Sequence, residues 1–91
     1  SAGCAITCAI LSAIEKKPLR QDIAITGEIA LSGEVKPVGG IHEKAFGARQ
    51  AGMKAMILPE KNKSDIDAGT AGIAIRPVAN IRDVWEIMTG K

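Results

Sequence analysis

The sequence predicts an α/β fold in which helices and strands alternate along the chain and pack in mixed layers. The first observation is the pattern, because short aliphatic runs of strand length are interspersed with stretches of helical character. The second is the composition, because 46% hydrophobic residues and a net charge of +2 exclude intrinsic disorder. A length of 91 residues indicates one domain or part of one, with a small core.

Residues 1–15 are predicted to form the first helix, since this segment contains small and aliphatic residues and no proline. Ser1 is suited to cap the start of the helix. Glu15 is followed by two lysines and Pro18, so the helix ends with cations near the negative pole of its dipole. Because apolar residues fall on every side of the helical wheel, we expect this helix to be buried on most sides.

The middle of the chain predicts strands and then a second helix. Asp22–Thr26 has the composition of a strand, and Glu28–Leu31 is either its continuation or a partner strand. A Ser-Gly turn follows, and Val35–Val38 is the next expected strand. Two glycines then break the chain before a helix at about residues 41–51, and Gly52 suits the position just after that helix.

The last third of the chain predicts two more strands and a final helix. Ala55–Leu58 is a short buried strand closed by a proline, and Ile73–Val78 is another strand. Between them, Lys61–Thr70 is a polar stretch with room for one helical turn from Ser64, and its first part, Lys61–Asp65, is expected to be a solvated loop. Asn80 is expected to cap an amphipathic helix over Ile81–Met88.

The composition also excludes several classes of function. The charge is too small to indicate nucleic acid or an anionic membrane as a partner, and the two aromatic residues, Phe46 and Trp85, are too few for a base-stacking surface. The apolar run Ala2–Ile14 is too short to span a bilayer and lacks the flanks of a signal peptide. Cys4 and Cys8 are expected to be inert core thiols. We therefore expect a soluble cytoplasmic chain.

Lys44 is the residue that departs from the pattern. On a wheel at about 100° per residue, the helix at residues 41–51 has a narrow apolar arc. That arc consists of Ile41, Ala45, Ala48 and Ala51. Lys44 falls inside it, whereas His42, the single histidine, lies on the solvent side. The small alanines leave room for a long side chain to lie inward.

An inward lysine has two interpretations. The bland one is snorkelling, in which the stem packs and the ammonium reaches water. In the functional one, burial lowers the pKa of a lysine amine, toward about 7–8 in catalytic cases, so that it serves as a general base. Such a base needs a hydroxyl partner. Ser1 is one candidate, with a plain N-cap as its alternative, and Thr26 is another, with an ordinary strand residue as its alternative.

Several linked motifs resemble one family. They are Ser1-Ala2-Gly3, Ile25-Thr26-Gly27-Glu28-Ile29, Val38-Gly39-Gly40-Ile41-His42-Glu43-Lys44, Ala51-Gly52-Met53-Lys54 and Ile57-Leu58-Pro59-Glu60-Lys61-Asn62. Their order and spacing resemble the proteolytic domain of Lon, the ATP-dependent serine protease. The resemblance implies the Lon proteolytic-domain fold, a mixed sheet with helices packed on it. It also implies that residues 1–91 are the C-terminal part of that domain, starting at the catalytic serine.

The resemblance also implies roles for individual residues. By position, Ser1 matches the catalytic serine, Lys44 the lysine of a Ser–Lys dyad, and Thr26 the threonine that supports this lysine. The implied activity is that of a serine endopeptidase in protein quality control, which degrades unfolded, damaged and regulatory proteins. The implied partners are the upstream half of the proteolytic domain and an AAA+ ATPase module, in a homo-hexamer.

No cofactor or metal site is expected in this segment. Gly27 and Gly33 have the wrong spacing for a Walker A loop, so ATP and magnesium are implied only for a separate ATPase module. Two other functions stay open. Ser1 could be the nucleophile of an N-terminal-nucleophile hydrolase activated by its own α-amine. Alternatively, the chain could be a catalytically silent Lon-like module that has a structural or assembly role in a DNA-repair ATPase.

Overall fold

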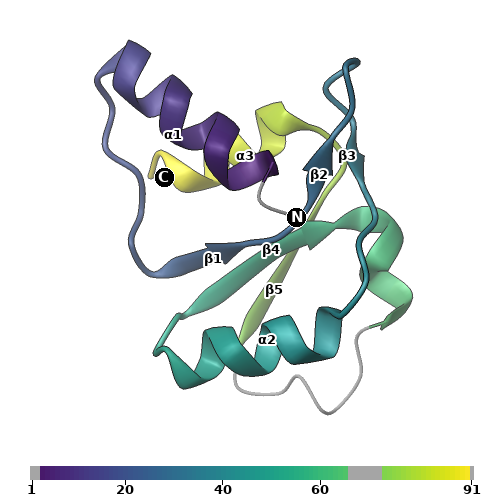
Figure 1. Ribbon diagram of the computed structural model, residues 1–91. Coiled ribbons are helices and arrows are strands. Elements are labelled where there is room, and N and C mark those ends of the chain that lie inside the picture. The colour runs from purple at the N-terminus through teal and green to yellow at the C-terminus, as the bar shows by residue number, and fades with distance from the viewer. Residues whose placement is uncertain (1–2, 66–72, 91) are drawn as a thin grey trace.

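The computed structural model describes residues 3–65 and 73–90. In chain order the elements are α1 (Gly3–Glu15), β1 (Ile23–Ile25), β2 (Glu28–Ile29), β3 (Val35–Lys36), α2 (Ile41–Gln50), β4 (Ala55–Pro59), the 3-10 helix η1 (Glu60–Asp65), β5 (Ala74–Val78) and α3 (Ile81–Met88). Figure 1 shows α1 and α3 on one face of the β1-β4-β5 sheet and α2 on the other. This layered arrangement confirms the predicted α/β class.

The strands form two sheets. The larger has the order β1-β4-β5, and both of its pairings are parallel, with Ile23 opposite Ala55 and Ala55 opposite Ala74. The smaller is the antiparallel pair of β2 and β3, in which Ile29 lies opposite Val35. Parallel and antiparallel strands thus both occur, as expected. The run after Thr26 is a partner of the next strand and not a continuation of β1.

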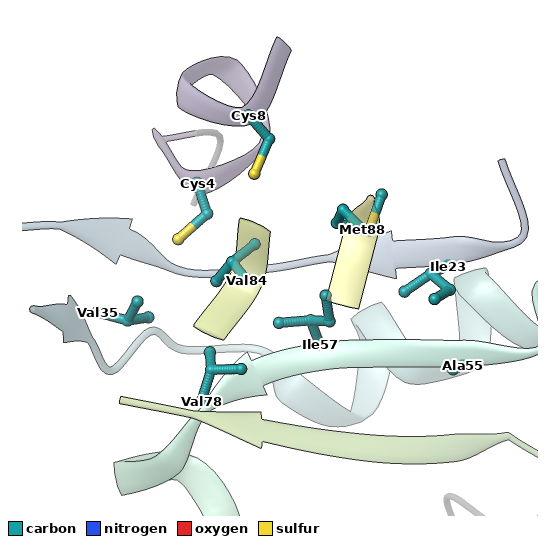
Figure 2. Packing of buried hydrophobic residues seen from close by; sticks show 9 residues of the cluster. All are labelled: Cys4, Cys8, Ile23, Val35, Ala55, Ile57, Val78, Val84 and Met88. Carbon is teal, nitrogen blue, oxygen red and sulfur yellow. The ribbon is translucent and has the colours of Figure 1, made fainter. Parts of the chain in front are cut away.

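β4 is the central strand and supplies the core on both faces of the sheet. All five of its residues are buried, which is typical of a parallel strand covered by helices on both sides. Ala55 and Ile57 belong to the cluster beneath α1 and α3, shown in Figure 2. Met56 and Leu58 belong to the cluster beneath α2. One short strand therefore joins the two halves of the core.

The prediction that the first helix is buried on most sides is wrong. Cys4 and Cys8 are its fully buried residues, and Figure 2 shows their side chains on the side of α1 that faces the sheet. Ile6, Ile10 and Ile14 are 57%, 55% and 66% exposed. The reason is that α3 and the sheet cover one side of α1 only. Ile6, Ile10 and Ile14 are spaced four residues apart, so their side chains lie in one row along the exposed side of α1.

The ends of α2 and α3 agree with the local sequence signals. Gly52 has a φ of 81°, and its N–H donates to the Arg49 carbonyl at 3.0 Å. The next N–H donates to the Ala48 carbonyl at 3.0 Å, which completes a Schellman motif. At the start of α3, Asn80 Oδ1 accepts a hydrogen bond of 3.1 Å from the Asp83 N–H, so the predicted cap is confirmed.

The expectation of a solvated loop after β4 is wrong for the part that the structure describes. Glu60–Asp65 forms the 3-10 helix η1, which begins directly where β4 ends. Its Asn62 is buried, with 4% of its surface exposed. The rest of the predicted polar stretch, residues 66–70, lies outside the described residues.

Candidate active site

Lys44 lies on the first turn of α2, and the chain in front of that helix determines where its amine goes. Gly40 precedes the helix in the left-handed conformation, with a φ of 71° and a ψ of 31°. The backbone N–H of Lys44 donates to the Gly40 carbonyl at 3.0 Å. Its side chain turns back, and Nζ donates to the Gly39 carbonyl at 2.7 Å. The amine is therefore held by a backbone oxygen beside the helix start.

The predicted apolar arc of α2 is confirmed over most of its length. Ile41, Ala45 and Ala48 are buried, whereas Ala51 is exposed. Lys44 is half-buried beside them. Its burial is therefore intermediate between that of a snorkelling lysine and that of a fully buried base. Its side chain is also one of those that line a hollow beside α2.

That hollow is a pocket of about 250 Å³ between α2 and the sheet. Its lining residues are mostly apolar: Ala24, Ile25, Thr26, Lys44, Ala48, Met53 and Met56. The polar side chains among them are those of Thr26 and Lys44. The structure thus brings together two of the three residues that the sequence singled out. The third, Ser1, lies outside the described residues.

Thr26 has a buried hydroxyl without a visible partner. Its backbone N–H donates to the Ile57 carbonyl at 2.9 Å, which extends the pairing of β1 with β4 by one residue. The residue is 3% exposed, and its Oγ1 has no hydrogen-bond partner among the described residues. Leaving a buried hydroxyl unpaired costs about 1–3 kcal/mol. A buried hydroxyl of this kind calls for a partner, such as an ordered water, an ion or another polar group.

The start of α1 is held against the chain that follows Thr26. The backbone N–H of Cys4 donates to the Gly27 carbonyl at 3.2 Å. A Cβ on Gly3 would lie 3.4 Å from the backbone nitrogen of Ile29, so the helix approaches the strand closely there. At Gly27, with a φ of 145°, a Cβ would lie 2.9 Å from Val35 Cγ1. Both glycines thus allow the N-terminus of α1, with its partial positive charge, to lie beside β2.

Sequence reasoning missed Asn62. Its Oδ1 accepts a hydrogen bond of 2.9 Å from the Val38 N–H, and its Nδ2 donates to the Val38 carbonyl at 2.8 Å. The side chain therefore bridges η1 to the segment that leads into α2. An asparagine in a polar stretch gives no local signal of burial. The one sign in the sequence was its place at the end of a motif shared with the resembled family.

The two cysteines are separate from this pocket. Both are free and buried on α1, as expected. Burial, aided by the neighbouring Cys8, raises the pKa of the Cys4 thiol to about 11. Burial also raises the pKa of Cys8. Thiols that resist ionisation are poor nucleophiles, so these two side chains serve the core.

The remaining candidates are unremarkable in the described parts of the chain. His42 is exposed on α2, as the wheel predicted. Within residues 3–65 and 73–90 there is no group of three His, Cys, Asp or Glu residues placed to hold a metal ion. No helix in these ranges combines the length and apolar character needed to cross a membrane. A wider hollow of about 590 Å³ is lined by Lys17, Pro18, Trp85, Glu86 and Thr89.

Comparison with known proteins decides the family. Residues 1–89 match the model of the Lon protease (S16) C-terminal proteolytic domain. The chain belongs to this family. Over 95 residues it is 42% identical to the Lon protease of Trichlorobacter lovleyi, an alignment that covers 100% of this chain and 12% of that protein.

Two further Lon relatives also match this chain over a small share of their own length. The mitochondrial Lon protease homologue of Bos taurus is 43% identical over 91 residues, covering 96% of this chain and 10% of the relative. The Lon protease of Fusobacterium nucleatum is 54% identical over 67 residues, covering 74% of this chain and 9% of the relative. The chain thus spans about a tenth of the length of the Lon proteases that it matches.

Membership of the Lon family confirms the resemblance that the linked motifs predicted. It places the Lys44 and Thr26 pocket in a domain whose family is named for proteolysis.

Proposed function

We propose that residues 1–91 are the C-terminal part of a Lon proteolytic domain that hydrolyses peptide bonds with a Ser–Lys dyad. In this proposal Ser1 is the nucleophile, Lys44 the general base, and Thr26 the residue that orients Lys44. The observation that carries it is the pocket that Lys44 and Thr26 both line, where the buried Thr26 hydroxyl has no hydrogen-bond partner among the described residues. Family membership supports the reaction class.

The hydrogen bonds available to Lys44 suit a base. An uncharged amine has two N–H donors and one lone pair. One N–H is donated to the Gly39 carbonyl at 2.7 Å. The Thr26 hydroxyl is available to accept the other. With both donors engaged, the lone pair takes the remaining tetrahedral direction, where it can accept the proton of a serine hydroxyl.

The reaction is acyl transfer in two steps. The lone pair of Lys44 takes the proton of Ser1 as the serine oxygen attacks the peptide carbonyl carbon. Backbone N–H groups near the start of α1 stabilise the oxyanion, and the lysine ammonium then returns the proton to the leaving amine. Water then attacks the carbonyl carbon of the acyl-enzyme while Lys44 takes its proton, and Lys44 returns that proton to the serine oxygen as the ester bond breaks. The acid product and free Ser1 result.

The role of the whole protein is part of the same proposal. Its substrates are unfolded, damaged and regulatory proteins, and it serves protein quality control in the cytoplasm. A separate AAA+ module that uses ATP and magnesium unfolds these substrates and feeds them to a homo-hexamer. The support is that relatives named Lon protease match the chain over a tenth of their own length.

The test compares Lys44→Arg with Lys54→Arg in the full-length protein. Arginine stays charged near neutral pH, so it cannot act as the base. We expect Lys44→Arg to lower the cleavage of a fluorogenic peptide by about 10²- to 10⁴-fold. Labelling of Ser1 by a serine-directed acylating probe should fall in parallel. Lys54 is exposed at the start of β4, and its variant should behave as wild type. Retained turnover in Lys44→Arg would overturn the dyad.

The same probe separates the other two functions. If Ser1 in the wild-type protein is never labelled, the chain is a silent module. If labelling survives Lys44→Arg but is lost when the α-amine is blocked, Ser1 acts as an N-terminal nucleophile.

A further inference from the structure

The backbone segment that contacts the Lys44 amine contains two consecutive glycines and therefore has little conformational restraint of its own. Gly39 supplies the carbonyl that accepts the hydrogen bond from Lys44, and Gly40 supplies the left-handed turn into α2. Two consecutive glycines have the largest conformational freedom of any dipeptide. The Gly39 carbonyl therefore keeps one orientation only if contacts from residues outside the glycine pair restrain the backbone.

Asn62 provides that restraint. Its Oδ1 accepts from the Val38 N–H at 2.9 Å, and its Nδ2 donates to the Val38 carbonyl at 2.8 Å. These two contacts fix the peptide planes on both sides of Val38, directly before the glycine pair. A flipped amide would set an oxygen against the Val38 carbonyl and an N–H against its N–H, so one orientation alone satisfies both contacts.

The restraint acts on Lys44 through a short connection. Only the two backbone torsions of Gly39 separate the plane fixed by Asn62 from the carbonyl that accepts the Lys44 amine. On the other side, the Lys44 N–H holds the Gly40 carbonyl at 3.0 Å. The glycine pair is thus restrained at one end by Asn62 of η1 and at the other by the Lys44 N–H of α2. We call the two hydrogen bonds between Asn62 and Val38 the clamp. Asn62 is itself buried, with 4% of its surface exposed, so the clamp is shielded from water.

We propose that Asn62 is a positioning residue for the base, which acts on Lys44 through Val38 and the Gly39 carbonyl. This inference rests on the proposed role of Lys44 in the Ser–Lys dyad. When the clamp is removed, the glycine pair regains its freedom and the acceptor of the Lys44 amine loses its fixed direction. The lone pair then points at the serine hydroxyl for a smaller fraction of the time.

The expected signature is a loss of kcat without a change in KM. A displacement of about 1 Å in a catalytic group can cost about 100-fold in rate. Asn62 is buried on η1 and bonded to backbone, so no substrate contact is lost when it is replaced. A general loss of folded protein would instead lower the number of active sites and leave the kcat of each one unchanged.

The experiment measures kcat and KM for a fluorogenic peptide in full-length Asn62→Leu and Asn80→Ala proteins. Active sites are counted from the end point of labelling with the serine-directed acylating probe, because a misplaced base slows labelling without lowering its end point. Asn80 is the matched control, because it also bonds backbone through its side chain but caps α3. We expect the kcat per active site of Asn62→Leu to fall by about 10- to 100-fold, with KM within about twofold. Asn80→Ala should keep the wild-type kcat per active site.

A second variant covers the case in which Asn62→Leu does not fold. Asn62→Asp keeps an acceptor for the Val38 N–H but turns an anionic oxygen toward the Val38 carbonyl. A protonated carboxyl group has one donor and one acceptor, like the amide that it replaces. The kcat of Asn62→Asp, divided by that of wild type at the same pH, should therefore rise as the pH falls. A role in folding alone would leave this ratio per active site independent of pH.

The outcomes separate this inference from the proposed function. If Lys44→Arg retains turnover, the dyad itself fails. If Lys44 is essential but Asn62→Leu keeps its kcat per active site, only the positioning role is overturned. The same holds if the kcat of Asn62→Asp relative to wild type does not change with pH. An equal loss of kcat in Asn80→Ala would also overturn it.

Discussion

The two faces of β4 differ in what covers them. On one face, Ile57 belongs to the cluster beneath α1 and α3 that also contains Cys4 and Cys8, and Figure 2 shows apolar and sulfur-bearing side chains gathered there. On the other face, Met56 lies beneath α2, where alanines are too small to fill the space and a pocket opens. Lys44 is one of the residues that line this pocket. One face of β4 is therefore closed by packed side chains, and the other is open to a pocket.

This difference predicts how substitutions on the two faces should behave. A change on the closed face should alter the free energy of unfolding but leave the kcat of each active site unchanged. A change on the open face should alter both, and in some cases with opposite signs. The four predictions below run from the largest expected change to the smallest.

Ile57→Ala should cause the largest loss of stability. The side chain is fully buried, and truncating such an isoleucine typically costs about 2–5 kcal/mol. The measurement is the opening free energy of β4 amides by hydrogen exchange in the full-length protein. Leu31→Ala is the control, because Leu31 is fully exposed and its truncation should cost almost nothing. A drop in kcat per active site in Ile57→Ala would contradict the division between the faces.

The thiols on the closed face should make its stability fall at high pH. Unfolded Cys4 ionises near its ordinary pKa of 9.0, whereas burial raises its pKa in the folded chain to about 11. Between these values the folded state binds more protons than the unfolded state, so stability decreases as pH rises. For Cys4 the loss approaches about 1.4 kcal/mol for each pH unit between these values, and the raised pKa of Cys8 acts in the same direction. The opening free energy of α1 amides, measured by hydrogen exchange, should show this decline. The double variant that carries both Cys4→Ala and Cys8→Ala should not show it.

Thr26→Val should raise stability and lower activity at the same time. Valine has nearly the same shape and removes a buried hydroxyl that has no partner among the described residues. The free energy of unfolding should rise by up to about 1–3 kcal/mol. Peptide cleavage should fall by about tenfold or more, because Lys44 loses its orienting acceptor. Thr26→Ser keeps the hydroxyl and should keep most of the cleavage. Full activity in Thr26→Val would remove Thr26 from the site.

Gly40→Ala and Gly39→Ala form a matched pair on the open face. At Gly40 the φ of 71° is unfavourable for alanine, and the added Cβ would lie 3.5 Å from Lys44 Nζ. A cost of about 1–2 kcal/mol is expected, together with reduced cleavage. At Gly39 an added Cβ meets nothing within 4 Å, so this variant should be milder. Thermal unfolding and peptide cleavage measure both effects, and equal behaviour of the two variants would contradict the argument.

Elements with local signals were predictable from the sequence. Gly52 ends α2 because its left-handed conformation completes a Schellman motif, and Asn80 begins α3 because its side chain accepts a backbone N–H. β4 is a continuous aliphatic run, as expected for a strand buried on both faces. In each case the information lies within a few residues of the element itself.

Features that depend on distant parts of the chain were not predictable in this way. The wheel of α1 shows apolar residues all round, but which side is covered depends on where α3 and the sheet lie. The wheel of α2 singled out Lys44, but it could not name the Gly39 carbonyl as the acceptor of its amine, because backbone atoms leave no trace in a pattern of side chains. Asn62 was missed because its partner, Val38, is remote in sequence.

The parallel pairing of β1 with β4 has a consequence for synthesis on the ribosome. Ile23 pairs with Ala55, more than thirty residues later, and β5 emerges later still. At about 5–20 residues per second, β1 waits roughly 2–6 s for its partner. During that time the edge of β1 that pairs with β4 lacks this partner, and α1 lacks the side chains of α3 that pack against it. The residues in front of β4 are thus the part of this chain for which a ribosome-bound chaperone has the most to shield.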